Sequence, residues 1–179
     1  TTFKPLLALF GSTLDDKDDL ALITDDVSRV DQVTNVLCPA PKSEGFSFEA
    51  AANYVRLFAR IMQDTPHLDI NSKDLPDMPT PDNNLIGDMA IYNNRDFLVK
   101  KGCSTCTLEN GSYRVQDFVT TYHPVGENPL QYAYCRNLIL DWNVSYAYRA
   151  LEDQFVVDHT LVRDNQMTDA PKTIKPKEW

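Results

Sequence analysis

The sequence predicts an α/β fold: a mixed β-sheet flanked by helices, a β-hairpin, and a long helix in the C-terminal half. Three observations support this prediction. Short apolar runs alternate with a helical pattern in the first third of the chain. Asn110-Gly111 separates two β-prone runs, and residues 130–157 repeat apolar side chains at helical spacing. At 179 residues we expect a single α/β domain spanning residues 1–179.

Three short apolar runs near the N-terminus predict strands. They cover Phe3–Phe10, Leu20–Ile23 and Val33–Leu37. The acidic run Asp15–Asp19 lies between the first two. Because runs of like charge usually face water, we expect it to form a solvated loop.

The first predicted helix runs from Ser47 to about Gln63. Ser47 is a suitable N-cap, and Glu49 lies in the first turn, where the helix dipole favours a negative charge. Pro66 ends the pattern. The predicted apolar face comprises Ala51, Tyr54, Val55, Phe58, Ile61 and Met62.

The middle of the chain predicts an irregular segment, a short helix and a hairpin. Three prolines between residues 68 and 85 exclude a regular helix or central strand. Asn93 is expected to cap a helix that ends at Lys101, with Gly102 just beyond it. The hairpin is predicted over Cys103–Tyr122, because Asn-Gly supplies the positive φ of a primed turn.

A second long helix is predicted from Leu130 to about Val157, and a turn at Asp164-Asn165. We expect this helix to be a main core element, so that Leu140→Ala or Phe155→Ala lowers the stability by about 2–5 kcal/mol. Trp142 and Tyr146 widen its apolar stripe. The stripe itself comprises Leu140, Val144, Ala147, Leu151 and Phe155.

The composition narrows the class of protein. A net charge of -9 disfavours binding to the phosphate backbone of nucleic acids. The apolar runs are too short to span a bilayer, and no basic segment of a signal peptide precedes the first strand. Because the chain begins at Thr1 without Met and ends at Trp179, we expect an excised fragment.

Cys103 and Cys106 form the sharpest candidate for chemistry. A C-x-x-C pair can be a redox centre or half of a zinc site. On the predicted strand, however, residues three apart point to opposite faces, so the two sulfurs would not converge. We therefore expect neither a metal nor a disulfide here, and free thiols at Cys38 and Cys135 as well.

The remaining polar patterns predict no site. His67, His123 and His159 lie apart in the sequence, without metal-ligand spacing, and a local His159–Asp158 contact is commoner than a catalytic dyad. The Asp15–Asp19 run lacks the glycine and the terminal glutamate of a calcium-binding EF-hand loop. Two Asn-x-Ser triplets, at Asn110 and Asn143, are interpreted as coincidence. We expect no catalytic, cofactor-binding or metal-binding residues.

An ordered series of segments between residues 45 and 179 resembles the sheath proteins of contractile phage tails, the Mu-like branch most closely. The family usually has Leu-Pro-Gly near residue 75, whereas here Asp77 replaces the glycine. Cys106 lies where the family favours an aliphatic residue. The similar segments, in chain order, are Gly45–Ala52, Asp74–Pro76, Asn93–Leu98, Gly102–Thr107, Val119–Tyr122, Tyr134–Leu138 and Lys175–Trp179.

The resemblance implies a sheath core domain without its terminal arms. Such subunits stack in rings around the tail tube, and their contraction drives the tube through the host envelope. The implied partners are other sheath subunits, the tail tube protein, and the baseplate and tail terminator proteins, with no nucleic acid, membrane or cofactor. The implied location is the virion tail, assembled in the host cytoplasm.

Two alternatives stay open at this stage. One is a small thiol-dependent or redox enzyme that uses the Cys103/Cys106 pair, and the other is a phage receptor-binding module. An enzyme is expected to have a deep pocket with convergent polar groups. Because neither terminus offers a free arm for strand exchange, we expect the isolated fragment to be monomeric.

Overall fold

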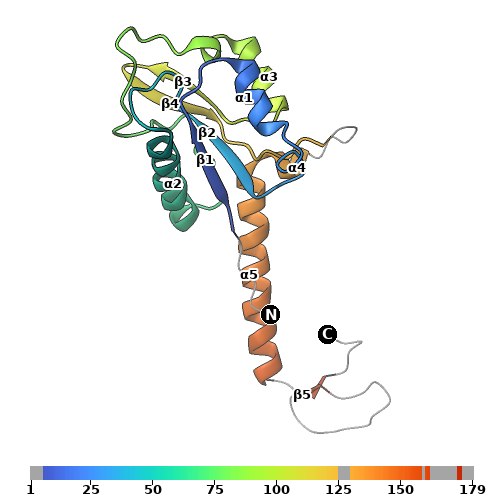
Figure 1. The fold of residues 1–179 in the computed structure, drawn as a ribbon. Helices are drawn as coiled ribbons and strands as arrows, with labels where there is room; N and C mark the ends of the chain where they lie inside the picture. Colours follow the sequence, from blue (N-terminus) through green and yellow to red (C-terminus); the bar gives the residue numbers. More distant parts are fainter. Residues whose placement is uncertain (1–5, 125–129, 159, 162–172, 175–179) are drawn as a thin grey trace. The chain divides into compact units, whose positions relative to one another are not determined.

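The computed structural model describes residues 6–124, 130–158, 160–161 and 173–174 (Figure 1). The predicted turn at Asp164-Asn165 lies outside these residues, as do residues 3–5 of the first predicted strand. The chain divides into two compact units, residues 1–140 and 141–179, which are described separately. The α/β class is confirmed, with small sheets accompanied by helices.

Two parallel strands form the centre of the first unit. Strand β1, Ala8–Ser12, pairs with β2, Asn35–Pro39, with Ala8 opposite Asn35 and Ser12 opposite Pro39. Both strands were predicted, but the predicted bounds begin and end at least two residues before the observed ones. The parallel pair requires a crossover connection, and helix α1, Lys17–Thr24, lies within it.

Helix α1 corrects two predictions. Leu20–Ile23 was predicted to be a strand, but it lies within the helix. Asp16, expected in a solvated loop, is the N-cap, and its carboxylate accepts the backbone N–H groups of Asp18 and Asp19 at 2.8 and 3.1 Å. The acidic run therefore provides acceptors for the otherwise unpaired N–H groups at the start of the helix. Its negative charges also interact favourably with the positive end of the helix dipole.

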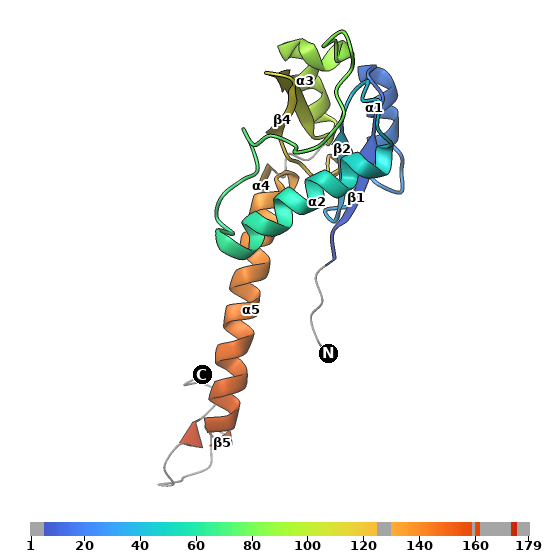
Figure 2. The ribbon, with the colours of Figure 1, turned by 90° about the vertical axis from the view of Figure 1, so that its left-hand side faces the viewer.

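Helix α2, Ser47–Asp64, confirms the first predicted helix. The N-cap is Phe46 rather than Ser47, and the Glu49 carboxylate accepts the Phe46 N–H at 2.7 Å. Tyr54 and Phe58 are buried as predicted, whereas Val55 is exposed. The helix packs closely against β1, and Figure 2 shows it crossing the strand pair.

Helix α3, Tyr92–Lys100, lies close to where it was predicted, and it follows a short 3-10 helix at Gly87–Ala90 that was not predicted. Gly102 follows the end of α3 with a φ of +69°, as a C-terminal glycine does. The irregular segment before it runs beside β4: Leu75 donates its N–H to the Tyr113 carbonyl at 2.7 Å.

The predicted hairpin is confirmed over a shorter span. Strands β3, Thr105–Glu109, and β4, Ser112–Asp117, pair antiparallel. Asn110 and Gly111 both have positive φ, 51° and 75°, as a type I′ turn requires.

The single mixed sheet that was predicted does not form among the described residues. There are three two-stranded sheets instead: β1–β2, β3–β4, and β5–β6 at Thr160–Leu161 and Thr173–Ile174. Prolines explain the break between β2 and the hairpin. Pro39 and Pro41 have no N–H to donate to a further strand, and their carbonyls accept side-chain hydrogen bonds from Tyr54, Cys106 and Tyr113.

The core of the first unit is centred on aromatic rings. Phe118 lies 5.8 Å from the ring of Tyr54 and 4.9 Å from that of Phe58, measured between centroids. All three side chains are buried, and the segment that carries Phe118 leads out of β4. These contacts hold α2 against the hairpin.

The predicted long helix forms as two helices, α4, Leu130–Ala133, and α5, Cys135–Asp158. Tyr134 interrupts them by bridging to Val119. Leu138 and Ile139, in the first unit, are buried. The stripe beyond them was expected in the core, and this is wrong: Val144 and Leu151 are 68% and 65% exposed.

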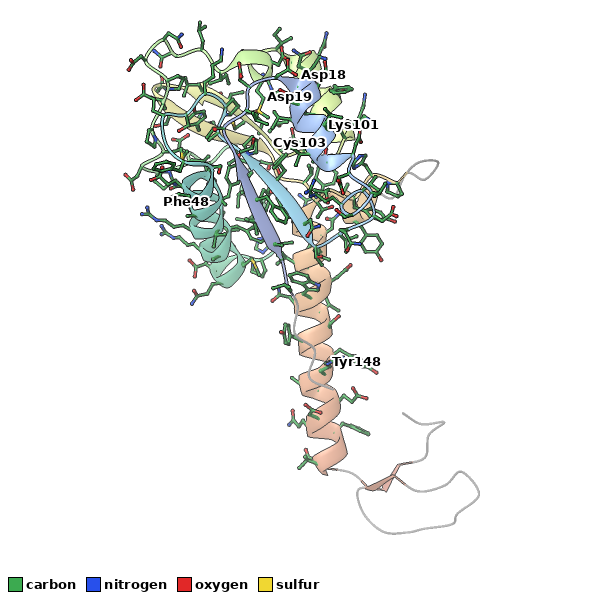
Figure 3. The ribbon with its side chains drawn as sticks, viewed as in Figure 1. Asp18, Asp19, Phe48, Lys101, Cys103 and Tyr148 are labelled. Carbon is green, nitrogen blue, oxygen red and sulfur yellow. The ribbon has the colours of Figure 1, made fainter. Side chains whose placement is uncertain are left out.

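Apolar side chains lie all around α5 and include exposed aromatics such as Tyr148 (Figure 3), so sequence spacing alone did not identify a buried face. Because Ile139 is buried, we expect Ile139→Ala to lower the stability by about 2–5 kcal/mol. The same loss is not expected for the exposed part of the stripe. No described helix is long and apolar enough to cross a membrane.

Candidate functional site

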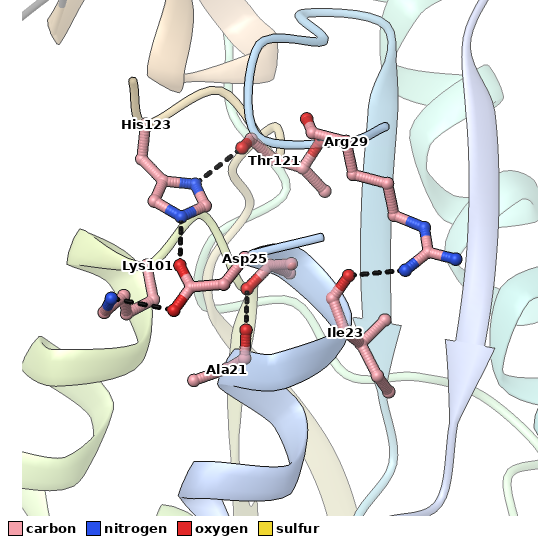
Figure 4. A network of polar contacts seen from close by, with 8 residues as sticks. Ala21, Ile23, Asp25, Arg29, Lys101, Thr121 and His123 are labelled. Atoms are coloured by element: carbon pink, nitrogen blue, oxygen red, sulfur yellow. Dashed lines mark hydrogen bonds and ion pairs between the residues drawn. The ribbon is translucent and has the colours of Figure 1, made fainter. Parts of the chain in front are cut away.

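A cluster of three ionisable side chains gathers at the ends of two helices in the first unit (Figure 4). Asp25 follows the last turn of α1 and donates its N–H to the Ala21 carbonyl. Lys101 follows the last turn of α3, and His123 lies beyond the hairpin. We call Asp25, Lys101 and His123 the Asp25 cluster.

Each oxygen of the Asp25 carboxylate has a partner. One oxygen lies 2.6 Å from Nε2 of His123, and the other lies 2.8 Å from Nζ of Lys101. Burial by itself would raise the pKa of Asp25, but hydrogen bonds from Lys101 and His123 and the charge of Lys101 lower it below its ordinary value. The carboxylate therefore stabilises the folded chain above the ordinary aspartate titration, and this contribution is lost as the pH falls through the lowered pKa.

Backbone contacts fix the histidine in place. Its N–H donates to the Val30 carbonyl at 3.0 Å, and its ring Nδ1 lies 2.7 Å from the Thr121 carbonyl. A Cβ added to Gly102 would lie 2.8 Å from the same ring nitrogen. The ring is thus held between the glycine and Asp25, and its side chain is only 13% exposed.

A surface depression of about 500 Å³ adjoins the cluster. Its lining combines the Asp25 cluster and Lys100 with three apolar side chains. The lining residues are Asp25, Val27, Val30, Phe97, Lys100, Lys101 and His123. Both ring nitrogens of His123 already face oxygen atoms of the chain, so general-base catalysis would require one of these contacts to open.

The two cysteines of the C-x-x-C pair are both fully buried. Strand β3 begins at Thr105, so only Cys106 lies on a strand, and the opposite-face argument does not apply to Cys103. Their thiols face different carbonyls, Cys103 that of Ser104 at 3.2 Å and Cys106 that of Pro39 at 3.5 Å. Burial raises the pKa of Cys103 and raises that of Cys106 to about 12.

We expect all four thiols to be inert in the folded chain. The cysteines are buried and free, and burial raises the pKa of each, so the reactive thiolate is scarce at neutral pH. With a colorimetric disulfide reagent, modification should proceed only as fast as the chain unfolds. Rapid modification of one or two thiols per chain before unfolding would show that a thiol is accessible. Such a result would support the thiol-dependent enzyme instead.

The other predicted polar residues do not join the Asp25 cluster. His67 is exposed, and His159 lies outside the described residues. Asp88 accepts the Lys17 N–H at 3.0 Å, which adds to the capping of α1. Within the described part of the chain, no group of three or more His, Cys, Asp or Glu side chains is arranged to hold a metal ion.

Sequence reasoning missed Asp25 and Lys101, and it placed His123 in no site. Lys101 and His123 lie 76 and 98 positions after Asp25 in the sequence, and no local pattern links the three residues. The only relevant sequence signals were the predicted end of α3 at Lys101 and the glycine after it.

A second candidate surface is the outer edge of β1. Ala8 donates to the Thr34 carbonyl, and the Ser12 carbonyl accepts the Ala40 N–H, so the even-numbered residues face β2. Because backbone groups alternate in direction along a strand, those of Leu9 and Gly11 point away from β2. Phe10 between them is 44% exposed, whereas Gly11 lies against α2, where an added Cβ would come within 1.5 Å of the Ser47 carbonyl oxygen.

Comparison with models of known protein families found no match, and comparison with curated proteins found none either.

Proposed function

We propose that this chain is part of a structural subunit of a contractile tail sheath of the Mu-like kind. In this proposal it is not an enzyme: it polymerises with its own copies around a tail tube and rearranges on contraction. Its partners would be other sheath subunits, the tube, and the baseplate and terminator proteins. The structural observation that carries the proposal is the outer edge of β1 near Leu9, together with the ordered resemblance from residue 45 onward.

The open edge supports assembly by strand addition. Parallel strands rarely stand as an isolated pair, because such sheets are usually covered and extended on both sides. Leu9 presents N–H and C=O groups that an extended segment of another subunit can pair with, whereas Gly11 lies against the backbone of α2. Exposed edges of this kind pair readily with other chains.

The similar segments also coincide with elements that shape the first unit. Asn93–Leu98 lies within α3, and Gly102 ends it with positive φ. Val119 and Tyr134, from two further segments, bridge to each other. The burial of Cys103 and Cys106 argues against the thiol-dependent alternative, because a nucleophilic or redox thiolate needs access.

Copy number in purified phage particles tests the proposal. A sheath subunit should be among the most abundant tail proteins, at a level comparable to the tube protein, by quantitative mass spectrometry of tail fractions. A receptor-binding module would be present in only a few copies per particle. Absence from particles, or such a low copy number, would overturn the sheath proposal.

A pair of proline variants tests the β1 edge itself. Leu9→Pro removes an N–H that points outward, which edge strands tolerate, whereas Phe10→Pro removes an N–H that faces β2. In the phage, Leu9→Pro should give folded protein but tails without a sheath. The control Phe10→Pro should give unstable protein. Normal sheaths with Leu9→Pro would exclude strand addition at this edge.

A further inference from the structure

The ring of His123 faces an oxygen acceptor at each nitrogen. Nδ1 lies 2.7 Å from the carbonyl oxygen of Thr121, and Nε2 lies 2.6 Å from the carboxylate of Asp25 (Figure 4). A neutral imidazole has one N–H and can donate to only one of these oxygens. The other nitrogen would then direct its lone pair at the lone pairs of an oxygen within hydrogen-bond distance.

The second proton belongs on the ring rather than on the carboxylate. Although burial raises the pKa of Asp25, the hydrogen bonds from Lys101 and His123 keep it below its ordinary value, so this group stays ionised at neutral pH. The arrangement that satisfies every polar atom is therefore an imidazolium and an ammonium on either side of one carboxylate.

The surroundings of the ring fit this charge. From α1, Asp25 faces the ring, and from α3, Lys101 shares its carboxylate, while Lys100 in the same depression is paired with Asp96 at 2.7 Å. The loop before β2 contributes the uncharged carbonyl of Val30, which accepts the histidine backbone N–H. The C-terminal ends of α1 and α3 both lie at the cluster, and such ends favour positive charge.

The segment held by His123 also carries the entry to the C-terminal helices. Thr120 donates its N–H to the Ala133 carbonyl at 2.7 Å and its hydroxyl to the Tyr132 carbonyl at 2.8 Å. Thr121 donates its N–H to Asn35 in β2. Movement of residues 119–123 would therefore disturb hydrogen bonds both to β2 and to α4.

We propose that His123 is a proton-operated latch that ties residues 119–123 to the ends of α1 and α3. With the ring doubly protonated, both contacts form and the segment is fixed. When the ring loses a proton to solvent, either the Asp25 or the Thr121 contact is lost, and the segment loosens. The latch is closed while the ring carries both protons, opens when it loses one of them, and fails in strong acid where Asp25 is protonated. This inference is independent of the proposed function.

Hydrogen exchange of the folded chain at several pH values tests the latch. After correction for intrinsic exchange, protection of the Thr121 and His123 amides should fall about tenfold or more between about pH 5.5 and 8.5, as for loss of one charge-assisted hydrogen bond. The variant His67→Gln is the matched control, since His67 is exposed and far from the cluster in sequence, and it should behave like the parent. Protection that does not change with pH in the parent would overturn the proposal.

A second variant separates the latch from general stability. Asp25→Asn keeps the shape, and its amide can donate to a neutral ring nitrogen, so the pH response of Thr121 and His123 should flatten while the fold is retained. Ring ¹⁵N shifts measured by NMR give the independent readout. The parent should contain imidazolium at mildly acid pH with both nitrogens protonated and hydrogen-bonded, and a single N–H there would contradict the proposal. An unchanged pH response in Asp25→Asn would contradict it too.

Discussion

Gly11→Ala should destabilise the first unit by about 3 kcal/mol or more, the upper range for overpacked cores. A Cβ at this position would lie 1.5 Å from the carbonyl oxygen of Ser47 and 3.0 Å from the backbone nitrogen of Ala51. Both atoms belong to the backbone of α2, so no side-chain rotation can relieve the contact. Either β1 or α2 has to move, and equilibrium unfolding in urea measures the resulting loss of stability.

Gly45→Ala is the matched control for this prediction. It lies just before the same end of α2, but its added Cβ would meet the end of the flexible Glu49 side chain at 2.5 Å. That side chain can swing away at the expense of its bond to the Phe46 N–H, which costs about 1 kcal/mol as other lost caps do. Equal losses for the two variants would mean that β1 and α2 are not in backbone contact.

Phe118→Ala should lower the free energy of unfolding by about 3–5 kcal/mol, as truncation of a buried aromatic residue does. The side chain is fully buried, and its ring contacts those of Tyr54 and Phe58, so removal leaves a cavity between α2 and the hairpin. Thermal and urea unfolding of the variant measure the loss.

Phe48→Ala is the control for the aromatic truncation. Phe48 is 67% exposed and stacks on Phe46, which is itself exposed, so the loss of stability should stay within about 0.5 kcal/mol. If Phe118→Ala proved as mild as this control, the aromatic core between α2 and the hairpin would be incorrectly placed.

Local signals predicted the elements whose determinants are close in sequence. The Asn110-Gly111 turn, α3 with Gly102 behind it, and α2 before Pro66 all depend on residues within a turn or two of one another. Helix α1 also had its local signals, an N-cap at Asp16 and acidic residues in the first turn, but the apolar run Leu20–Ile23 was too short to distinguish a helix from a strand.

What the sequence could not predict was set by distant contacts. The division into small sheets depends on where the carbonyls of Pro39 and Pro41 find donors, and these come from residues 54, 106 and 113. The Asp25 cluster likewise joins three separate segments. In α5, apolar residues lie on several faces, so spacing could not tell which residues are buried.

The side-chain bonds to the end of β2 have a consequence for the order of folding. Tyr54 and Tyr113 donate to the carbonyls of Pro39 and Pro41, across 15 and 72 residues of chain, and Cys106 reaches Pro39 across 67. The hairpin closes through a turn of two residues and can form early, whereas β2 gains these partners only after the hairpin and α2 are in place. On a ribosome, the parallel strand pair would gain all of these partners only after Tyr113 has emerged, although its own residues emerge earlier.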